Sequence, residues 1–337
     1  MDTLSNTRLV SLPPVELDAG QIRRADSQEV EPAIRLILSS PSGPADPQQV
    51  HDLVRLACCP HSPALGLMVA RTFDGLVSAA LPVVSPGRTM LLFAPGHFPT
   101  PEHERIAGRV VAEVCRRAAK ADVHLAQVLL DPSDVRLADL YSQWGFARLA
   151  ELIYLHSYIA RSVQDQPLPP PYRWRTYAPE THELFARTIV RTYQQSLDCP
   201  ALNGLRSIED IIAGHKAAGE FDPAMWFLLC QGKSPLGVLI LSPVFNADSV
   251  ELVYLGLVPE ARGRGLGQWM MRHAATATAA RRRCRLTLAV DASNRPALRL
   301  YWQHGMQSVV RRVAMLRDLR SLVDRAESLS TSHPQPH

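Results

Sequence analysis

The chain lacks several features that are typical of zinc-binding, membrane-spanning and secreted proteins. Its six cysteines show no CxxC spacing and its twelve histidines form no spaced cluster, so no zinc site is indicated. No uninterrupted apolar run approaches the ~20 residues that cross a bilayer, and the N-terminus has no basic segment followed by an apolar stretch. We therefore expect a cytoplasmic protein with reduced thiols, without a metal and without membrane contact.

Lysine is nearly absent, since it occurs only at Lys120, Lys216 and Lys233 among 36 basic residues, which we attribute to genomic base composition. A formal net charge of +4 over 337 residues gives no indication of a nucleic-acid partner. The run RRRCR at Arg281–Arg285 could form an RNA-binding patch, but cations near a helix C-terminus are favoured by the helix dipole alone. The length allows two ordinary domains, and 46% hydrophobic with 20% charged residues is typical of globular proteins.

The segment VELVYLGLVPEARGRGLGQWM, at Val250–Met270, predicts a strand, a glycine-rich turn and the start of a helix. The first turn of a helix offers unpaired N–H groups and a positive dipole end, which bind anions. The spacing is not G-x-G-x-x-G, and no Gly-Lys-Ser/Thr follows, so neither a dinucleotide site nor a P-loop is indicated. Closely spaced glycines permit close approach and arginines add charge for a diphosphate, at Arg262, Gly263, Arg264, Gly265 and Gly267.

A second pattern follows downstream. RLTLAVD, at Arg285–Asp291, predicts a buried strand, and SNRPALRLYWQHGM, at Ser293–Met306, predicts a capped helix. Asn294 or the serine before it can cap this helix, Pro296 falls in its first turn, and Gly305 suits a left-handed exit.

These two patterns resemble the two CoA-contacting segments of the GNAT N-acyltransferase superfamily. The first is R-x-x-G-x-G, and the second is N-x-x-A-x-x-L-Y-x-x-x-G. The resemblance implies acetyl-CoA as co-substrate, with an Asn that contacts the pantetheine arm and a Tyr that protonates the departing thiolate. The residues that it assigns to acetyl-CoA binding are Leu257, Val258, Arg262, Gly263, Arg264, Gly265, Leu266, Gly267, Gln268, Asn294 and Tyr301.

The chain contains an internal repeat. A shift of 160 places Asp131 on Asp291 (291 − 131 = 160) and LYSQWGF on LYWQHGM, so that Tyr141 falls on Tyr301. We therefore expect a mixed α/β (α+β) fold of two tandem GNAT-like domains, each a mostly antiparallel sheet flanked by helices. The expected divisions are a degenerate domain at 1–163, a proline-rich linker at 164–172, an acyltransferase domain at 173–320 and a disordered tail at 321–337.

The first copy has lost the residues of the glycine turn. Glu102, Glu104 and Arg105 occupy the positions of Arg262, Arg264 and Gly265, and a leucine stands where the second copy has Glu251. Carboxylates would repel an anion there, so we expect this copy to keep the fold without the chemistry. Its tyrosine, at position 141, is interpreted as packing.

Glu251 is an acid inside an otherwise apolar strand, eight residues before Pro259 and so roughly 25 Å of chain away. A partly desolvated carboxylate can accept the proton of an attacking amine. The strand E-L-V-Y-L-G-L-V-P is similar to E-V-Y-V-V-G-V-x-P of tandem enzymes of the mycothiol synthase type, which implies a catalytic Glu251. Two structural alternatives stay open: Glu251 as a strand-end carboxylate that faces water, and Tyr301 as an aromatic that packs the helix on the sheet.

The expected activity is N-acetyl transfer from acetyl-CoA to an amine in a ternary complex, with the thioester carbonyl polarised by backbone N–H groups near Leu257 and Val258. We expect the acceptor to be a small-molecule or peptide amine, and we expect the protein to be a monomer or a homodimer. The acids between Asp198 and Asp222 could form a pocket for a cationic amine or only a charged surface. The alternative function is a non-catalytic acyl-CoA sensor or scaffold, which would keep the glycine turn without depending on Glu251 or Tyr301.

We expect one CoA site per chain, in the second copy, because the first presents Glu102 and Glu104 at the matching turn. Calorimetric titration with acetyl-CoA should give a stoichiometry near one. Combining Gly265→Glu with Gly267→Glu should abolish binding, because side chains and negative charge would occupy the turn. A stoichiometry near two, or binding that survives both substitutions, contradicts this expectation.

Overall fold

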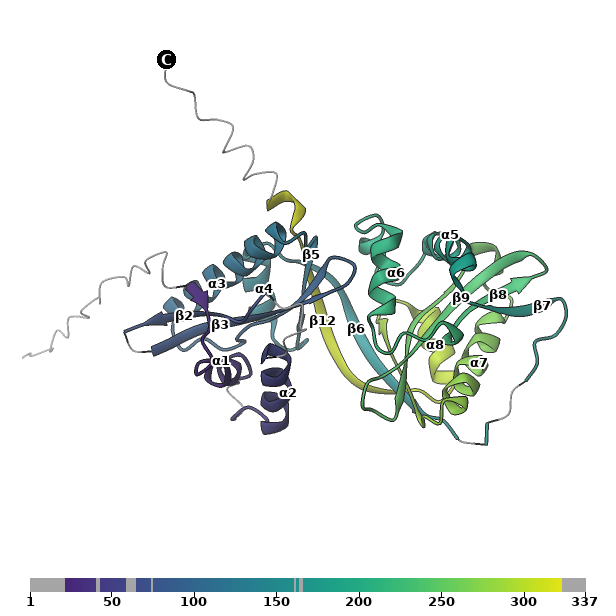
Figure 1. The fold of residues 1–337 in the computed structure, drawn as a ribbon, viewed down its shortest axis with the longest axis horizontal. Coiled ribbons are helices and arrows are strands. Elements are labelled where there is room, and N and C mark those ends of the chain that lie inside the picture. The colour runs from purple at the N-terminus through teal and green to yellow at the C-terminus, as the bar shows by residue number, and fades with distance from the viewer. Residues whose placement is uncertain are drawn as a thin grey trace, which may run out of the picture. The chain divides into compact units, whose positions relative to one another are not determined.

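The computed structural model describes residues 22–40, 43–58, 65–73, 75–160, 162–163 and 166–322 (Figure 1). The expected C-terminal tail lies outside these residues except for its first two positions. The described strands are β1 (Ile22–Arg24), β2 (Met68–Thr72), β3 (Gly75–Ser85), β4 (Thr89–Phe93), β5 (Leu125–Leu130), β6 (Ala147–Tyr158), β7 (Tyr172–Thr176), β8 (Trp226–Gln231), β9 (Ser234–Pro243), β10 (Ser249–Leu257), β11 (Arg285–Asp291) and β12 (Gln307–Asp318). The described α-helices are α1 (Val30–Ile37), α2 (Pro47–Cys58), α3 (Pro101–Lys120), α4 (Val135–Gln143), α5 (His182–Tyr193), α6 (Ile208–Lys216), α7 (Leu266–Ala280) and α8 (Arg295–Gln303).

The chain divides into two compact units. The described residues of the first fall within Met1–Cys59, Gly66–Leu81 and Ala94–Glu113. In it, β2 pairs antiparallel with β1 and β3, and α1 packs on α2. Hydrogen bonds from Arg23, at 2.7 and 2.8 Å, lower the pKa of the buried Glu29 carboxyl to about 2. None of the described helices combines the length and hydropathy that a bilayer-spanning segment requires.

The second unit holds a mixed sheet in the strand order β4-β5-β12-β6-β11-β10-β9-β8-β7. The pairs β4–β5 and β10–β11 are parallel, whereas the other pairs recorded in this series are antiparallel. The predicted fold class, a mixed and mostly antiparallel sheet flanked by helices, is confirmed.

The sequence repeat is also a structural repeat. In the first copy, Thr89 pairs with Leu125 and Leu91 with Gln127. In the second, positions 249 and 285 pair, as do Glu251 and Thr287, and each of these positions lies 160 residues after its counterpart. The two copies therefore share one strand register.

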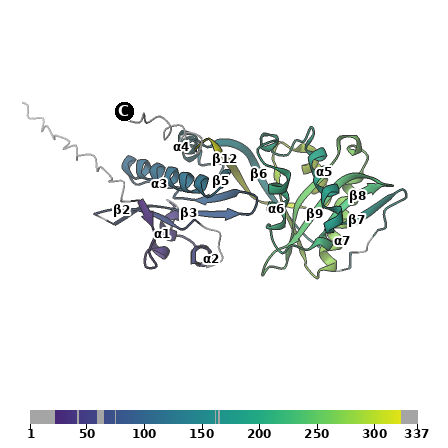
Figure 2. The ribbon, with the colours of Figure 1, turned by 45° about the horizontal axis from the view of Figure 1, so that its top comes forward.

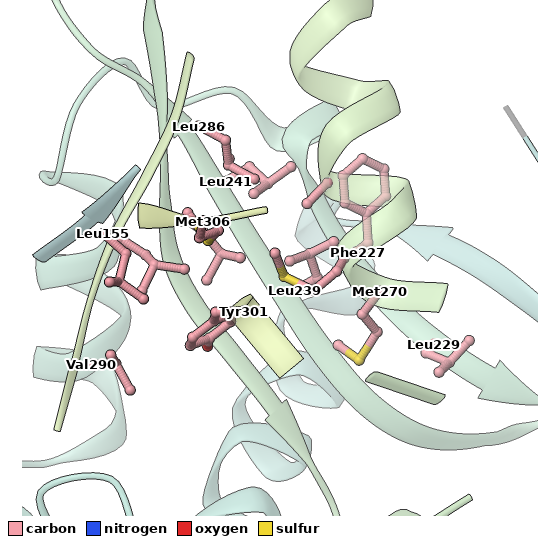
Figure 3. Close-up of a cluster of buried hydrophobic side chains, with 14 of the residues drawn as sticks. Leu155, Phe227, Leu229, Leu239, Leu241, Met270, Leu286, Val290, Tyr301 and Met306 are labelled. Atoms are coloured by element: carbon pink, nitrogen blue, oxygen red, sulfur yellow. The ribbon is translucent and has the colours of Figure 1, made fainter. Parts of the chain in front are cut away.

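The final strands of the two copies are exchanged. Strand β6, from the first copy, pairs with β11 of the second through Leu152–Tyr158, while β12 from the second copy lies between β5 and β6. Figure 1 shows β12, in yellow, beside β6, in teal. Leu155 of β6 thus lies among buried side chains of the second copy, such as Leu239, Met270 and Tyr301 (Figure 3).

The sheet of the second copy carries helices on both faces. Met270 of α7 and Leu298 of α8 belong to one buried cluster, and Phe185 of α5 and Ile212 of α6 belong to another. Helix α5 packs on β9 and β10 (Figure 2). Helix α5 ends at Tyr193, because the backbone of Gln194 is extended and that of Gln195 is left-handed, at φ 53°.

A fragment of residues 172–337 lacks β6, so β11 and β12 would each lose an antiparallel partner and expose an unpaired edge. We expect this fragment to be less stable or poorly soluble. A fragment of residues 146–337 keeps β6 and is the matched control, which should be more soluble and unfold at higher urea. Recovery of monomeric 172–337 with full stability and unchanged turnover would rule out this role of the first copy.

Candidate active site

The candidate site begins where β10 and β11 stop pairing. Their parallel ladder runs over Ser249–Glu251 and Arg285–Thr287, and in the described chain the strands diverge beyond these pairs. A cavity of about 490 Å³ lies beside the diverging part of β10, and residues 252–257 form one of its walls. The connection at 195–198, the glycine turn, residues 289–290 of β11 and the segment of helix α8 at 294–301 also line it.

The free edge of β10 supplies amides to this cavity. The register on β9 shifts between Leu252 and Tyr254, which marks a β-bulge. Val258 donates its N–H to Leu236 O at 2.9 Å. Because alternate residues of an antiparallel strand face opposite edges, the N–H groups of Leu255 and Leu257 point away from β9. The Val258 amide is therefore already paired within the sheet, whereas the Leu257 amide faces the free edge; the polarising role expected of these two residues stays a prediction.

The glycine turn has the backbone geometry that the sequence predicted. Gly263 and Gly265 have left-handed φ angles of 73° and 74°, and helix α7 begins at Leu266, directly after them. Gly267 has a different role, since a Cβ there would lie 3.0 Å from Leu300 Cδ2. Its missing side chain allows α7 to pack closely on α8.

The guanidinium of Arg262 hydrogen-bonds backbone carbonyls of the protein. Its guanidinium donates to Leu257 O at 3.1 Å, and to the carbonyls of Thr192, Gln194 and Gln195 at 2.8–3.0 Å. It therefore closes the C-terminal end of α5 against the turn, where helix carbonyls lack intrahelical partners. Its assignment to acetyl-CoA stays a prediction, and these contacts support a positioning role.

The two other polar side chains of this segment also contact the protein. Arg264 is exposed and donates to Tyr172 Oη at 2.7 Å. Gln268 bonds Gln303 and His304 of the α8 end, at 2.5 and 2.6 Å. The phosphate-binding capacity of the turn therefore lies mainly in its backbone amides and in the end of the α7 dipole.

Glu251 is partly buried at the last pair of the parallel ladder, beside the cavity and not among its lining residues. Val250 and Leu252 belong to the cluster under α7 and α8, so Glu251 points to the opposite face, which carries α5. Burial raises the pKa of Glu251 above its ordinary value of 4.5. Burial, and then the charge of Glu251, raise the pKa of Tyr154, which places this tyrosine of the exchanged strand β6 near the carboxylate.

Tyr301 and Asn294 both line the cavity. Tyr301 is buried, and burial followed by the nearby charge of Asp198 raises the pKa of its hydroxyl. Asn294 caps α8 by accepting from Ala297 N at 3.3 Å, and its side chain also hydrogen-bonds Asp198. Pro296 and Gly305 occupy the helix start and the left-handed exit, as predicted.

Asp198 is the functional candidate that sequence reasoning did not single out. It stood within a group of five acids, and among the described lining residues it is the one of these that reaches the cavity. The other four acids do not line the cavity. Glu209 hydrogen-bonds His182, Asp210 accepts a hydrogen bond from Ser207 Oγ, and Asp222 forms an ion pair with Arg281. The fourth is Glu220. No spacing distinguishes Asp198 from them, so only the fold of the α5–α6 connection reveals it.

The corresponding turn of the first copy is helical. Helix α3 begins at Pro101, whereas the equivalent of Leu266 in α7 is Ile106, so helix occupies the positions of the glycine turn. Glu102 and Arg105 form an ion pair of 2.7 Å there. Tyr141 is buried edge-on against the rings of Trp144 and Phe146, which agrees with packing.

Replacing Arg262 by Ala should lower the free energy of unfolding by about 2 kcal/mol or more, because it removes charge-assisted bonds to several carbonyls. Arg264→Ala is the matched control and should cost under about 1 kcal/mol, since that side chain is exposed. Urea denaturation measures both. Equal effects of the two substitutions would show that Arg262 does not hold α5 in place.

Residues 192–306 match the acetyltransferase (GNAT) family. A GCN5-related N-acetyltransferase from Sphaerobacter thermophilus aligns with a TM-score of 0.58 and 16% identity, covering 89% of this chain and 95% of that one. A fungal GCN5-related glucosamine N-acetyltransferase region aligns with a TM-score of 0.55 and 13% identity, covering 88% of this chain and 37% of that one. A tandem GNAT protein from the clavulanic acid biosynthesis pathway has a TM-score of 0.49 and 14% identity, and the alignment covers 88% of this chain and 97% of that one. Among curated proteins none matches.

Identities this low indicate a shared fold only, and the family match covers the part of the chain that contains the cavity and the turn. Residues 192–306 are therefore similar to an acetyltransferase domain of the GNAT family, and the chain shares the fold of GNAT proteins.

Proposed function

We propose that the chain transfers an acetyl group from acetyl-CoA to an amine in one direct step. The observation that carries this proposal is the cavity itself, which joins the free edge of β10 to the glycine turn and to Tyr301. An extended thioester fits such a groove with its diphosphate at the start of α7.

The backbone supplies the binding groups. The unpaired amides at the start of α7 receive the diphosphate, and the free edge of β10 receives the pantetheine arm in the manner of an added strand. The Leu257 amide then lies near the thioester carbonyl, where it stabilises the negative charge that develops on the oxygen.

The side chains supply the proton path. The amine nitrogen forms a bond to the thioester carbon while the C–S bond breaks. Glu251 receives the proton of the amine, directly or through water, and its raised pKa makes it a stronger base than an exposed carboxylate. Tyr301, whose pKa is also raised, stays protonated at neutral pH and gives its proton to the departing thiolate.

Transfer through a covalent intermediate on Cys199 is disfavoured by the state of its thiol. Cys199 follows Asp198 directly, and burial together with Asp198 and Asp291 raises its pKa to about 12. A thiolate is the nucleophilic form, so this thiol is unreactive at neutral pH. Direct attack by the amine fits these electrostatics.

The competing function is a non-catalytic acyl-CoA sensor or scaffold. A thiol-release assay with acetyl-CoA and a panel of amines, aminoglycosides, amino acids, peptides and glucosamine separates the two. Turnover with any acceptor supports the proposal. Acetyl-CoA binding without release of CoA across the panel would favour the sensor.

Glu251→Gln and Tyr301→Phe should each lower kcat by ~10²-fold or more, because they remove a base and an acid, while acetyl-CoA affinity stays within a few-fold of wild type. If both variants turn over within a few-fold of wild type, Glu251 and Tyr301 are structural. If they instead lose acetyl-CoA binding, the assigned roles are wrong.

The stability of Glu251→Gln provides an internal control. Since burial raises the pKa of Glu251, the folded state binds this proton more tightly than the unfolded chain does, and stability falls as pH rises above the ordinary value of 4.5. The variant should therefore be more stable than wild type at pH 7 and lose this advantage below about pH 4. Reduced stability at pH 7 would mean that lost activity reflects misfolding.

A further inference from the structure

Asp198 is the carboxylate among the described residues that line the cavity, and it is exposed to the cavity space. It belongs to the connection between α5 and α6, and it lines the same cavity as the free edge of β10. A ligand that reaches the Tyr301 hydroxyl therefore passes an accessible negative charge.

The protein holds this carboxylate in one orientation. Its Oδ1 accepts from Asp291 N at 3.2 Å, and Asn294 also hydrogen-bonds it. The carboxylate of Asp291 is held in turn, because it accepts from Cys199 N at 3.2 Å and from Ser293 N at 2.8 Å. These bonds attach the connection to the corner between β11 and α8.

The charges around Asp198 favour a cation. Burial raises the pKa of Asp198, the hydrogen bond from Asp291 N lowers it, and the charge of the nearby Asp291 carboxylate raises it again, so a bound cation would stabilise the ionised form. Arg262, the cation that lines the cavity, directs its guanidinium to four backbone carbonyls. Burial raises the pKa of Tyr193 to about 12; the charge of Arg206 opposes this rise and the charge of Asp198 adds to it, so both charges lie near this tyrosine.

We propose that Asp198 binds the ammonium group of the acceptor, so that the enzyme selects amines that are cationic at neutral pH. This inference rests on the proposed acetyltransferase function and names its acceptor class. The ammonium donates hydrogen bonds to the Asp198 carboxylate, and the amine gives its proton to Glu251, directly or through water, before it attacks the thioester.

The test compares two acceptors of similar size, benzylamine, which is cationic at pH 7, and aniline, which is neutral there. In the wild type, kcat/KM should favour benzylamine. Asp198→Asn keeps the side-chain shape and should lower this preference by about 10-fold or more, the effect of losing a hydrogen bond to a charged group. Glu209→Gln, in the same acidic segment and outside the cavity lining, is the control and should leave the preference unchanged.

Binding gives a readout that needs no turnover. Calorimetric titration of benzylamine into the protein saturated with CoA should show about 10-fold weaker binding for Asp198→Asn, with acetyl-CoA affinity unchanged. If wild type binds benzylamine in this way without turnover, the acetyltransferase proposal fails and the ammonium site stands. If Asp198→Asn binds and discriminates as wild type does, or if the wild type does not bind benzylamine, the inference is overturned.

Discussion

The site depends on one constraint of the sheet, the early end of the parallel ladder between β10 and β11. Pairing stops at Glu251 and Thr287, so the next residues of β10 keep hydrogen-bonded contact with β9 alone. Strand edges that carry unpaired amides are normally covered or blunted. Here the uncovered edge becomes a wall of the cavity, and the left-handed glycines place the start of α7 at the end of the same groove.

The exchange of β6 and β12 explains why a first copy without the glycine turn can still be required. Its strand β6 pairs with β11 and brings Tyr154 near Glu251. The β3–β4 turn also packs closely on α6, because a Cβ at Gly87 would lie 2.1 Å from Asp210 O. Arg206 donates hydrogen bonds to the carbonyls of both residues. The stability of the second copy therefore depends on strands and turns that the first copy supplies.

Sequence reasoning predicted the parts of this site that rest on local backbone chemistry. The glycine turn, the cap at Asn294 and the exit at Gly305 follow from residue types at set spacings, and the 160-residue repeat predicted the shared register. It could not predict the exchange of strands, because equal repeats allow pairing within a copy or between copies. It also missed the carbonyl partners of Arg262 and the position of Asp198, since both depend on how the chain folds after α5.

The central claim is that the free edge of β10 and the start of α7 together bind acetyl-CoA for transfer. A crystal structure of the protein with acetyl-CoA tests it most directly. The account predicts the diphosphate at the amides of residues 263–267, the thioester carbonyl within hydrogen-bond distance of Leu257 N, and the sulfur near the Tyr301 hydroxyl. Acetyl-CoA bound outside this groove, or bound with its thioester away from β10 and Tyr301, would contradict it.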